Sequence, residues 1–492
     1  MTADAARTGQ IDAPSRSDRF VRGLSEAIGG PLGRHAAGGP AGRFAAAARV
    51  VLALTCVTLV LHWLQKFPCQ DADWDDLEQY TRFCYTDVIP LYGAQGGLLH
   101  GGVPYLDYAL EYPVVTGFFM TLIGVPVHAL GTAVSINEYQ WFYHLTALGL
   151  FACAIATAAM LLSLRRRRTW DVAMFALSPA LLVTATVNWD LLAIVLAVGG
   201  LLAWARRLPV HAGVLLGLGT AAKLWPGLLF LPLIMLALRT GRHRPVWTSV
   251  ATGVGTWLAV NVPVMLANFD NWKRFLELNT HRPVDWGTLW YVGRFLDGAW
   301  RSGVPGDRGP FQWLAAHVDP YLNWTSYALF LAACAGIAWL TLRAPRRPRV
   351  AQLAFLVVAA FLLTSKVWSQ QFTLWLLPLL VLARPRWRAF LAWQAAEICY
   401  FLAFYGKMLI ESGRDVMPEG VFVLAAAGRW VAVAVLCLLI VHDIRYPRLD
   451  PVRAVYPDDP DAGVLADPVD PGPTAPSARP AAPGWIAPHS GN

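Results

Sequence analysis

The feature that most constrains this chain is a series of long apolar blocks separated by short clusters of arginine. A helix needs about 20 apolar residues to cross a bilayer, and several of these blocks reach that length. Hydrophobic residues make up 56% of the 492 positions and charged residues only 15%, which leaves too little polar surface for a soluble domain of this size. The sequence therefore predicts an all-α polytopic membrane protein with about 10–13 transmembrane or re-entrant helices and a first loop on the outside.

The apolar pattern defines ten spans. They are residues 44–64, 140–163, 170–187, 191–205, 246–267, 325–342, 350–364, 372–383, 390–405 and 421–441. Several are short, which is tolerable where helices surround a protein-lined cavity instead of lipid. The flanking composition predicts a disordered cytoplasmic tail at 1–43, a membrane domain at 44–443 and a second disordered tail, rich in Pro, Ala and Asp, at 444–492.

The arginine clusters set the predicted orientation. They lie at residues 165–168, 206–207, 239–244, 343–349 and 384–388. By the positive-inside rule these clusters face the cytoplasm, together with both termini. Residues 66–111 carry eight acidic and two basic side chains and are placed outside. The net charge of +8 thus reflects membrane topology, and no nucleic-acid partner is expected. The predicted location is the cell membrane, crossed many times.

Two segments do not fit as simple spans. Residues 112–133 start outside, and a full crossing would place the next arginine cluster outside as well. They are therefore predicted to dip in from the outer face and return, along a path interrupted by prolines and glycines. Residues 210–238 have basic clusters on both sides, so they predict a hairpin of two short helices with Lys223 at its tip. One long tilted helix is the alternative, and it breaks the charge rule.

Cysteine and histidine positions say little about metals or cofactors. Cys69 and Cys84 both lie in the first outside loop, a compartment that permits a disulfide, and the sequence leaves open whether they are bonded. No His/Cys cluster with metal-ligand spacing is present in the sequence. We therefore expect no metal and no cofactor, with the need for a divalent ion left undecided.

Carboxylates in the first outside loop are candidates for acid–base chemistry. Asp87 lies among aromatic and aliphatic residues, whereas the acids at 71–76 form a polar cluster that should be solvated. A carboxylate just outside the membrane can act as a general base toward a hydroxyl, and the alternative is an ordinary solvated loop acid. Glu111, followed by Tyr112, is either a second functional carboxylate or a charge favoured at a helix N-terminus.

Polar residues inside apolar surroundings form a second group of candidates. Asn188 and Asp190 lie in a turn between two apolar segments, where they either form the turn or hold a ligand. Lys223 is a charge in the middle of its segment, which favours a functional role over snorkelling to the interface. Glu397 lies alone in an apolar block and needs a partner, for which Lys407 or a backbone group is the candidate.

Cations and amides in two later loops could bind an anion or hydroxyls. His281 and Arg282 follow a short amphipathic stretch, and Arg282 suits a phosphate through its fork of donors. The turn at 365–371 contributes Lys366 as a second phosphate candidate, with Gln370 and Gln371 as hydrogen-bonding groups. The alternative for the 279–286 region is an interfacial loop with ordinary anchoring.

Several short motifs, taken in order, resemble the GT-C superfamily of membrane glycosyltransferases. They are YTDVIPLY at 85–92, GGVPY at 101–105, EYP at 111–113, NWD at 188–190, AAKLWP at 221–226, and the 365–371 turn before LWLLP at 374–378. The chain is most similar to glycosyltransferase family 87, the actinobacterial polyprenol-phosphate-mannose-dependent mannosyltransferases. The resemblance covers most of 44–441 and neither tail.

This resemblance implies a GT-C-like catalytic domain that moves a sugar, expected to be mannose, from a polyprenyl-phosphate donor to a glycolipid or glycan acceptor of the cell envelope. The catalytic acid of the first outside loop corresponds to Asp87, which would deprotonate the acceptor hydroxyl for an inverting attack. Lys366, Arg282 and Lys223 are the candidates for stabilising the leaving phosphate. Related enzymes have histidines where this chain has Gln370 and Gln371. His281 is a candidate to compensate for that difference.

Two other classes of function stay open on the sequence alone. A glycolipid transporter or flippase would show matched repeats and polar groups through the bilayer depth, and neither is evident in the sequence. A noncatalytic scaffold for envelope assembly is the third reading. Purified protein supplied with a radiolabelled polyprenyl-phosphate sugar separates these readings, because an enzyme transfers the sugar whereas a transporter moves the labelled lipid across vesicles without transfer.

Overall fold

The computed structural model describes residues 18–29, 44–94, 97–301 and 309–466. Within these ranges the regular secondary structure is helical, and the chain forms no β-sheet. Six helices are long and apolar enough to cross a membrane by length and composition. They are α3 (Phe44–Lys66), α6 (Val114–Ala133), α7 (Glu138–Leu164), α13 (His243–Ala267), α17 (Asn323–Arg343) and α21 (Glu419–Arg445). The predicted polytopic helical class is confirmed.

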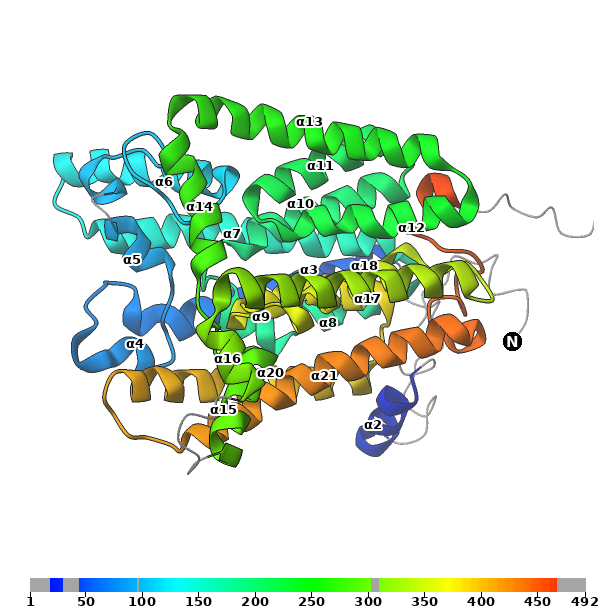
Figure 1. The fold of residues 1–492 in the computed structure, drawn as a ribbon. Helices are drawn as coiled ribbons and strands as arrows, with labels where there is room; N and C mark the ends of the chain where they lie inside the picture. Colours follow the sequence, from blue (N-terminus) through cyan, green and yellow to red (C-terminus); the bar gives the residue numbers. More distant parts are fainter. Residues whose placement is uncertain (1–17, 30–43, 95–96, 302–308, 467–492) are drawn as a thin grey trace, which may run out of the picture.

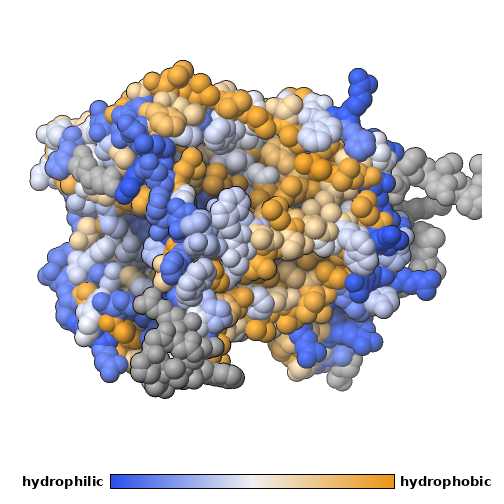
Figure 2. All heavy atoms as spheres, viewed as in Figure 1, coloured by the Kyte–Doolittle hydropathy of each residue, from blue (hydrophilic) through white to orange (hydrophobic). Residues whose placement is uncertain are grey.

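The long helices run side by side between two polar ends (Figure 1). Figure 2 shows apolar side chains over the middle of the molecule and hydrophilic side chains gathered at both ends. We call the end that carries the arginine clusters the arginine end, and the opposite end the loop end. The apolar belt between them is where lipid chains would contact the protein. A further long helix, α20 (Trp387–Glu411), runs from the arginine end to the loop end.

Shorter helices form three hairpins whose tips lie inside the bundle. The pairs are α9 (Pro179–Thr184) with α10 (Asp190–Ala205), α11 (Pro209–Ala222) with α12 (Phe230–Thr240), and α18 (Val350–Thr364) with α19 (Thr373–Ala383). Lys223 leaves α11 in an extended conformation, and Pro226 lies in the 3₁₀ turn that follows. The predicted hairpin with Lys223 at its tip is therefore confirmed.

The predicted single span at 170–187 is wrong, because the chain there is broken. A 3₁₀ segment at Arg166–Val172 leads into the short α8 (Ala173–Ala176), and the backbone then becomes extended at Ser178. Pro179 disfavours a helical conformation for the residue before it, so α8 cannot continue into α9. The Ser178 side chain instead caps α9 by accepting from the Leu181 N–H.

The predicted interruption of residues 112–133 is also wrong. Val114–Ala133 is one continuous helix of 20 residues, and a short turn connects it to α7. Its glycines are sites of close packing, because a Cβ at Gly117 or Gly124 would collide with the side chains of Tyr105 or Leu98. Unbroken hydrogen bonding is also what an apolar environment demands of a backbone.

At the loop end an amphipathic helix, α14 (Phe269–His281), runs crosswise to α13 and α17 (Figure 1). It connects α13 to two further helices, α15 (Leu289–Arg301) and α16 (Pro310–Ala316). Between α14 and α15 lies the segment 282–288. This segment is one wall of the site described below.

Part of each predicted disordered tail is ordered at the arginine end. Residues 446–466 pack there because their carboxylates neutralise buried arginines: Arg165 pairs with Asp461 at 2.6 Å and Arg349 with Asp450 at 2.7 Å. At the other terminus, α2 (Arg19–Gly29) is helical and contacts α20. Disorder is therefore wrong for 18–29 and 446–466. The rest of both predicted tails lies outside the described residues.

Candidate active site

Three hairpin tips meet in the interior of the bundle. Lys223 places its Nζ 2.8 Å from Asp190 Oδ1 and 3.1 Å from Asn188 Oδ1. Trp375, near the start of α19, donates to the same Asp190 oxygen over 2.6 Å. Asp190 is buried. Lys223 is therefore a partnered internal charge that ties the tips together, and it does not reach out to the membrane surface.

Aromatic rings enclose this ion pair. Tyr112 is buried and packs edge-on against Trp189, with the ring centroids 5.3 Å apart. Lys223 Nζ lies 5.5 Å from the Tyr112 ring centroid and 5.3 Å from that of Phe372. Such contacts stabilise a cation at the ring face. Tyr112 thus belongs to the support of Lys223.

Asp87 is anchored next to the Asn188 tip. Its backbone N–H donates to the Val187 carbonyl over 2.8 Å, and Asn188 Nδ2 lies 3.5 Å from Asp87 Oδ2. Tyr85 lines the same cavity as Asp87. Burial raises the pKa of Asp87 above its usual value, and the charge of Glu111 adds to this rise, while Tyr85, Lys223 and Asn188 offset part of it.

A cavity of about 350 Å³ lies beside Asp87. It brings together residues from the first loop, the 282–288 segment, the α18–α19 tip and α20. Its lining residues are Tyr85, Asp87, Val187, Arg282, Pro283, Val284, Asp285, Trp286, Ser369, Gln370, Gln371, Phe404 and Met408. Four of the predicted site residues, Asp87, Arg282, Gln370 and Gln371, therefore share one cavity.

The cavity wall carries polar groups that a ligand can use. Arg282 is exposed, and no carboxylate of the described residues pairs with it. Gln370 is only 4% exposed, yet its Oε1 has no hydrogen-bond partner among the described residues. Asp285 accepts from Ser369 Oγ over 3.2 Å. A buried acceptor without a partner is costly unless a ligand or water satisfies it.

The other predicted candidates lie near the cavity but do not line it. Lys366 donates to the Thr280 carbonyl over 2.8 Å, at the end of α14 just before Arg282. His281 has a 71% exposed side chain, and its Nε2 lies 3.7 Å from Asp319 Oδ2. Glu111 is exposed. The structure thus brings Lys366 and His281 to the end of the same helix, where they flank Arg282.

Two groups that matter here were not singled out from the sequence. Asp285 lies within the 279–286 motif, but nothing in its spacing distinguished it from an ordinary loop acid. Arg429 lies in the middle of α21 and could have been found by the same rule that found Lys223, a charge within an apolar block. Arg429 pairs with Glu397 at 2.9 Å, so the expectation of Lys407 or a backbone group as the partner of Glu397 is wrong.

Arg429 also fixes the α18–α19 tip. Its guanidinium donates to the carbonyls of Trp368 and Ser369, each over 3.1 Å, and stacks on the rings of Trp368 and Tyr400. Lys407, in contrast, pairs with Glu411 and Glu419. The buried Arg429–Glu397 pair therefore holds the turn that presents Gln370 to the cavity.

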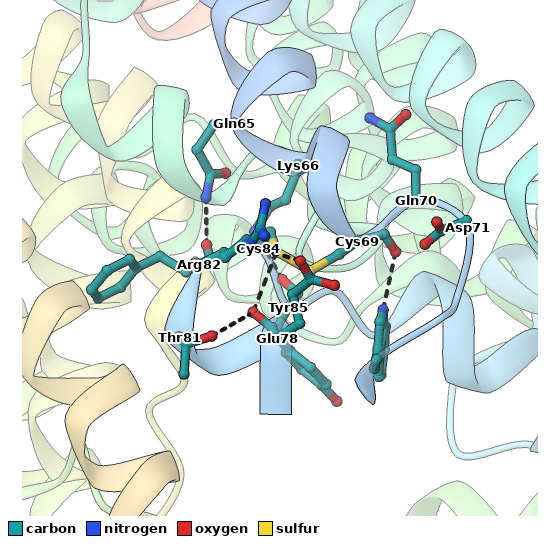
Figure 3. The surroundings of a disulfide bond; sticks show 12 residues. Gln65, Lys66, Cys69, Gln70, Asp71, Glu78, Thr81, Arg82, Cys84 and Tyr85 are labelled. Carbon is teal, nitrogen blue, oxygen red and sulfur yellow. Dashed lines mark hydrogen bonds and ion pairs between the residues drawn. A yellow bond between two sulfur atoms is a disulfide. The ribbon is translucent and has the colours of Figure 1, made fainter. Parts of the chain in front are cut away.

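The first loop is closed by a disulfide between Cys69 and Cys84, whose Cα atoms are 5.8 Å apart (Figure 3). The bond joins the segment after α3 to the segment that leads into Asp87. Among the described residues, no group of three or more His, Cys, Asp or Glu side chains is arranged to hold a metal ion. The groups that the cavity offers are two carboxylates, a guanidinium, amides and aromatic rings.

Comparison with known proteins identifies the family of this chain. The sequence model of glycosyltransferase family 87 matches residues 113–368, just over half of the 492 residues. The match contains the Lys223 tip, Arg282 and Lys366, and it ends before Gln370 and starts after Asp87. No curated protein matches the chain. The chain therefore belongs to glycosyltransferase family 87 and is a membrane glycosyltransferase.

Proposed function

We propose that this protein transfers a sugar, mannose, from a polyprenyl-phosphate donor to a hydroxyl of a glycolipid or glycan acceptor, with Asp87 as the general base. The observation that carries the proposal is the shared cavity, in which the Asp87 carboxylate and the Arg282 guanidinium both line the wall. An acceptor hydroxyl needs a base, and a leaving phosphate needs a cation. One cavity offers both.

In the proposed reaction Asp87 takes the proton of the acceptor hydroxyl as its oxygen attacks the anomeric carbon. The bond between that carbon and the phosphate oxygen breaks, the configuration inverts, and polyprenyl phosphate leaves with the bonding electrons. Arg282 stabilises the negative charge on this phosphate through a charge-assisted hydrogen bond. Burial raises the pKa of Asp87, which makes the carboxylate a better proton acceptor near neutral pH.

The remaining polar wall fits a sugar. Gln370 and Gln371 are each 4% exposed and line the cavity, and Asp285 lies there with its Ser369 hydrogen bond. Amide and carboxylate groups recognise sugar hydroxyls, and the nearby rings of Trp286 and Phe404 offer apolar faces. The assignment of mannose rests on the family resemblance, and the amides are the contacts through which we expect the sugar to be selected.

Lys366, His281 and Lys223 have supporting parts in this proposal. Lys366 binds the carbonyl two residues before Arg282 and so holds the end of α14 against the α18–α19 tip. His281 adds a titratable group beside Arg282. Lys223 keeps Asn188 in place through its 3.1 Å hydrogen bond, and Asn188 in turn contacts Asp87.

We place the cavity on the outer face of the cell membrane. The arginine end then faces the cytoplasm, as the positive-inside rule requires. The disulfide between Cys69 and Cys84 is suited to an oxidising exterior. A lipid-linked donor reaches the cavity from the bilayer, and a hydrophilic acceptor reaches it from outside.

The test is sugar transfer by purified protein from radiolabelled polyprenyl-phosphate mannose to an envelope glycolipid extract. Asp87→Asn should lower kcat about 100- to 10,000-fold, the usual contribution of a general base. Asp73→Asn removes an exposed acid of the same loop and should leave the rate unchanged. Equal rates for wild type and Asp87→Asn would refute the base assignment. Labelled lipid that moves across vesicles without transfer would favour a transporter.

A further inference from the structure

A second cavity at the loop end has no part in the proposed reaction so far. Its volume is about 600 Å³, within the range of about 300–1,000 Å³ that is usual for ligand pockets. We call it the α15–α16 cavity, because α15 packs against α16 and against α21 (Figure 1) and all three helices line it. The lining residues are Tyr291, Arg294, Phe295, Gly298, Gln312, Ala315, Ala316 and Glu419.

Two polar side chains of this cavity have hydrogen-bonding groups available for a ligand. Arg294 is exposed, and no carboxylate of the described residues lies within ion-pair distance of its guanidinium. The guanidinium lies over the Tyr291 ring, 4.8 Å from its centroid, a contact that holds a cation at a ring face. The Gln312 side chain makes no hydrogen bond within the described part of the chain, whereas its backbone N–H donates to Asp297 over 3.1 Å. The cavity therefore offers both donors and acceptors.

The charges of the cavity favour a neutral, hydroxyl-rich ligand over an anion. Glu419 accepts from the Tyr291 hydroxyl and pairs with Lys407 at 3.3 Å. Lys407 is also paired with Glu411 at 2.8 Å, so its charge is compensated. The Glu419 side chain is still 44% exposed, and an anion in the cavity would meet its charge as well as that of Arg294. Hydroxyl groups both donate and accept, and they can use a cation and an anion on one wall.

The α15–α16 cavity is a neighbour of the cavity beside Asp87. Trp286 lines the cavity beside Asp87, and Tyr291 lines the α15–α16 cavity. Lys407 Nζ lies 5.6 Å from the Trp286 ring centroid and 5.7 Å from that of Tyr291. The residue after it, Met408, lines the cavity beside Asp87. One lysine thus contacts the walls of both cavities, so an extended ligand can reach from one to the other.

We propose that the α15–α16 cavity is an acceptor subsite, which binds a neutral oligosaccharide portion of the acceptor while the reacting hydroxyl lies beside Asp87. The inference rests on the proposed function and adds where the acceptor is held. Arg294 and Gln312 donate to sugar hydroxyls, and Glu419 accepts from them. Phe295 offers an apolar face to the ring carbons. Because these contacts lie away from the reacting atoms, they contribute to acceptor affinity and not to the rate of the chemical step.

The first test measures the acceptor and donor dependence of sugar transfer separately. Arg294→Ala should raise the acceptor KM about 10- to 100-fold, the effect of one charge-assisted hydrogen bond, and leave kcat and the donor KM unchanged. Ala316→Trp fills the cavity without removing a polar group and should also raise the acceptor KM. Arg82→Ala is the matched control, because Arg82 is an exposed arginine of the first loop, paired with Glu78, and lines neither cavity. Its kinetic constants should equal those of wild type.

The second test measures saccharide binding without catalysis. The probe is the pool of water-soluble glycans released from the envelope glycolipid extract by deacylation, and saturation-transfer NMR detects the glycans that bind purified protein. Wild type and Arg82→Ala should give equal signals, and Arg294→Ala and Ala316→Trp should each reduce the signal several-fold. Signals in both cavity variants that equal that of wild type would overturn the proposal.

The binding test does not depend on activity, so the proposed function and the acceptor subsite fail in different ways. Glycan binding that requires Arg294, in a protein that transfers no sugar, leaves the saccharide-binding cavity intact and refutes the proposed function. Normal sugar transfer with an unchanged acceptor KM in Arg294→Ala and Ala316→Trp does the reverse. A fall in kcat with no change in the acceptor KM would also overturn the subsite, because a residue that only binds acceptor does not act on the chemical step.

Discussion

The buried Arg429–Glu397 pair offers the sharpest test of how the site is built. Arg429 is fully buried and Glu397 only 3% exposed on its side chain, and both lie within long apolar helices. Removing one member of a buried pair leaves an uncompensated charge, which costs about 3–5 kcal/mol. We therefore expect Arg429→Met to lower the free energy of unfolding by about this amount.

The double variant Arg429→Met with Glu397→Gln distinguishes the free-energy cost of an unpaired buried charge from the cost of lost hydrogen bonds. It removes both charges, and the cost that remains is the loss of the two 3.1 Å hydrogen bonds to the Trp368 and Ser369 carbonyls. At about 0.5–1.5 kcal/mol for each bond, the loss should be about 1–3 kcal/mol. The double variant should thus be more stable than the single one.

Activity should not recover with stability. The 368–370 turn loses its anchor in both variants, and a displacement of about 1 Å at a reacting centre can cost about a hundredfold in rate. Stability is measured by SDS-induced unfolding followed through tryptophan fluorescence, and activity by mannose transfer. Arg414→Met, which breaks an exposed pair with Asp76, is the control and should cost at most about 1 kcal/mol.

Two results would refute this reasoning. If Arg429→Met were as stable as Arg414→Met, the pair would not compensate a buried charge. If the double variant regained full activity, the geometry of the α18–α19 tip would not depend on Arg429.

Three further predictions concern the cavity and the arginine end. Arg282→Ala should lower kcat/KM about 10- to 100-fold, the value of one charge-assisted hydrogen bond. Arg282→Lys should recover only part of this, since an ammonium lacks the fork of donors. Arg274→Ala, in the preceding helix α14, is the control, and equal losses would contradict the role of Arg282. Asp450→Asn leaves the buried Arg349 without its partner and should cost about 3–5 kcal/mol of stability, whereas the exposed Asp415→Asn should cost nothing measurable. Burial raises the pKa of Asp87 in the folded state. The carboxyl group therefore makes its full contribution to stability at pH values below its pKa in the unfolded chain. This contribution is lost as the pH rises through its pKa in the folded state. Asp87→Asn should therefore melt at a higher temperature than wild type at pH 8, with a gap that closes as pH falls, and a lower melting temperature at pH 8 would contradict this.

The sequence was sufficient for most of the long helices and for the position of Lys223. Apolar length and arginine clusters are local properties, and they predicted the spans at 44–64 and 350–364 almost to the residue. Lys223 was predicted at a hairpin tip because one long helix between two basic clusters would break the positive-inside rule. Both results depend on the exclusion of charge and unpaired backbone from lipid, which acts on each segment separately.

Local rules failed where a segment depends on what packs against it. The glycines of α6 read as interruptions, but Tyr105 and Leu98 occupy the space beside Gly117 and Gly124, and the helix stays continuous. The acidic composition of residues 446–466 predicted a solvated tail. In the structure, buried arginines at the end of α7 and the start of α18 pair with these acidic side chains. In both regions the partner lies far away in the sequence.

The same distinction between local and tertiary information applies to the candidate active site. Residue type and position nominated Asp87, Arg282, Gln370 and Gln371 from the sequence. Only the tertiary structure decided that these four share one cavity, that Lys366 binds a carbonyl beside it, and that Asp285 and Arg429 belong to its surroundings. The physical reason is that the membrane fixes which segments are buried, whereas the pairing of charges inside the bundle is settled by side-chain contacts between hairpins that the chain order does not bring together.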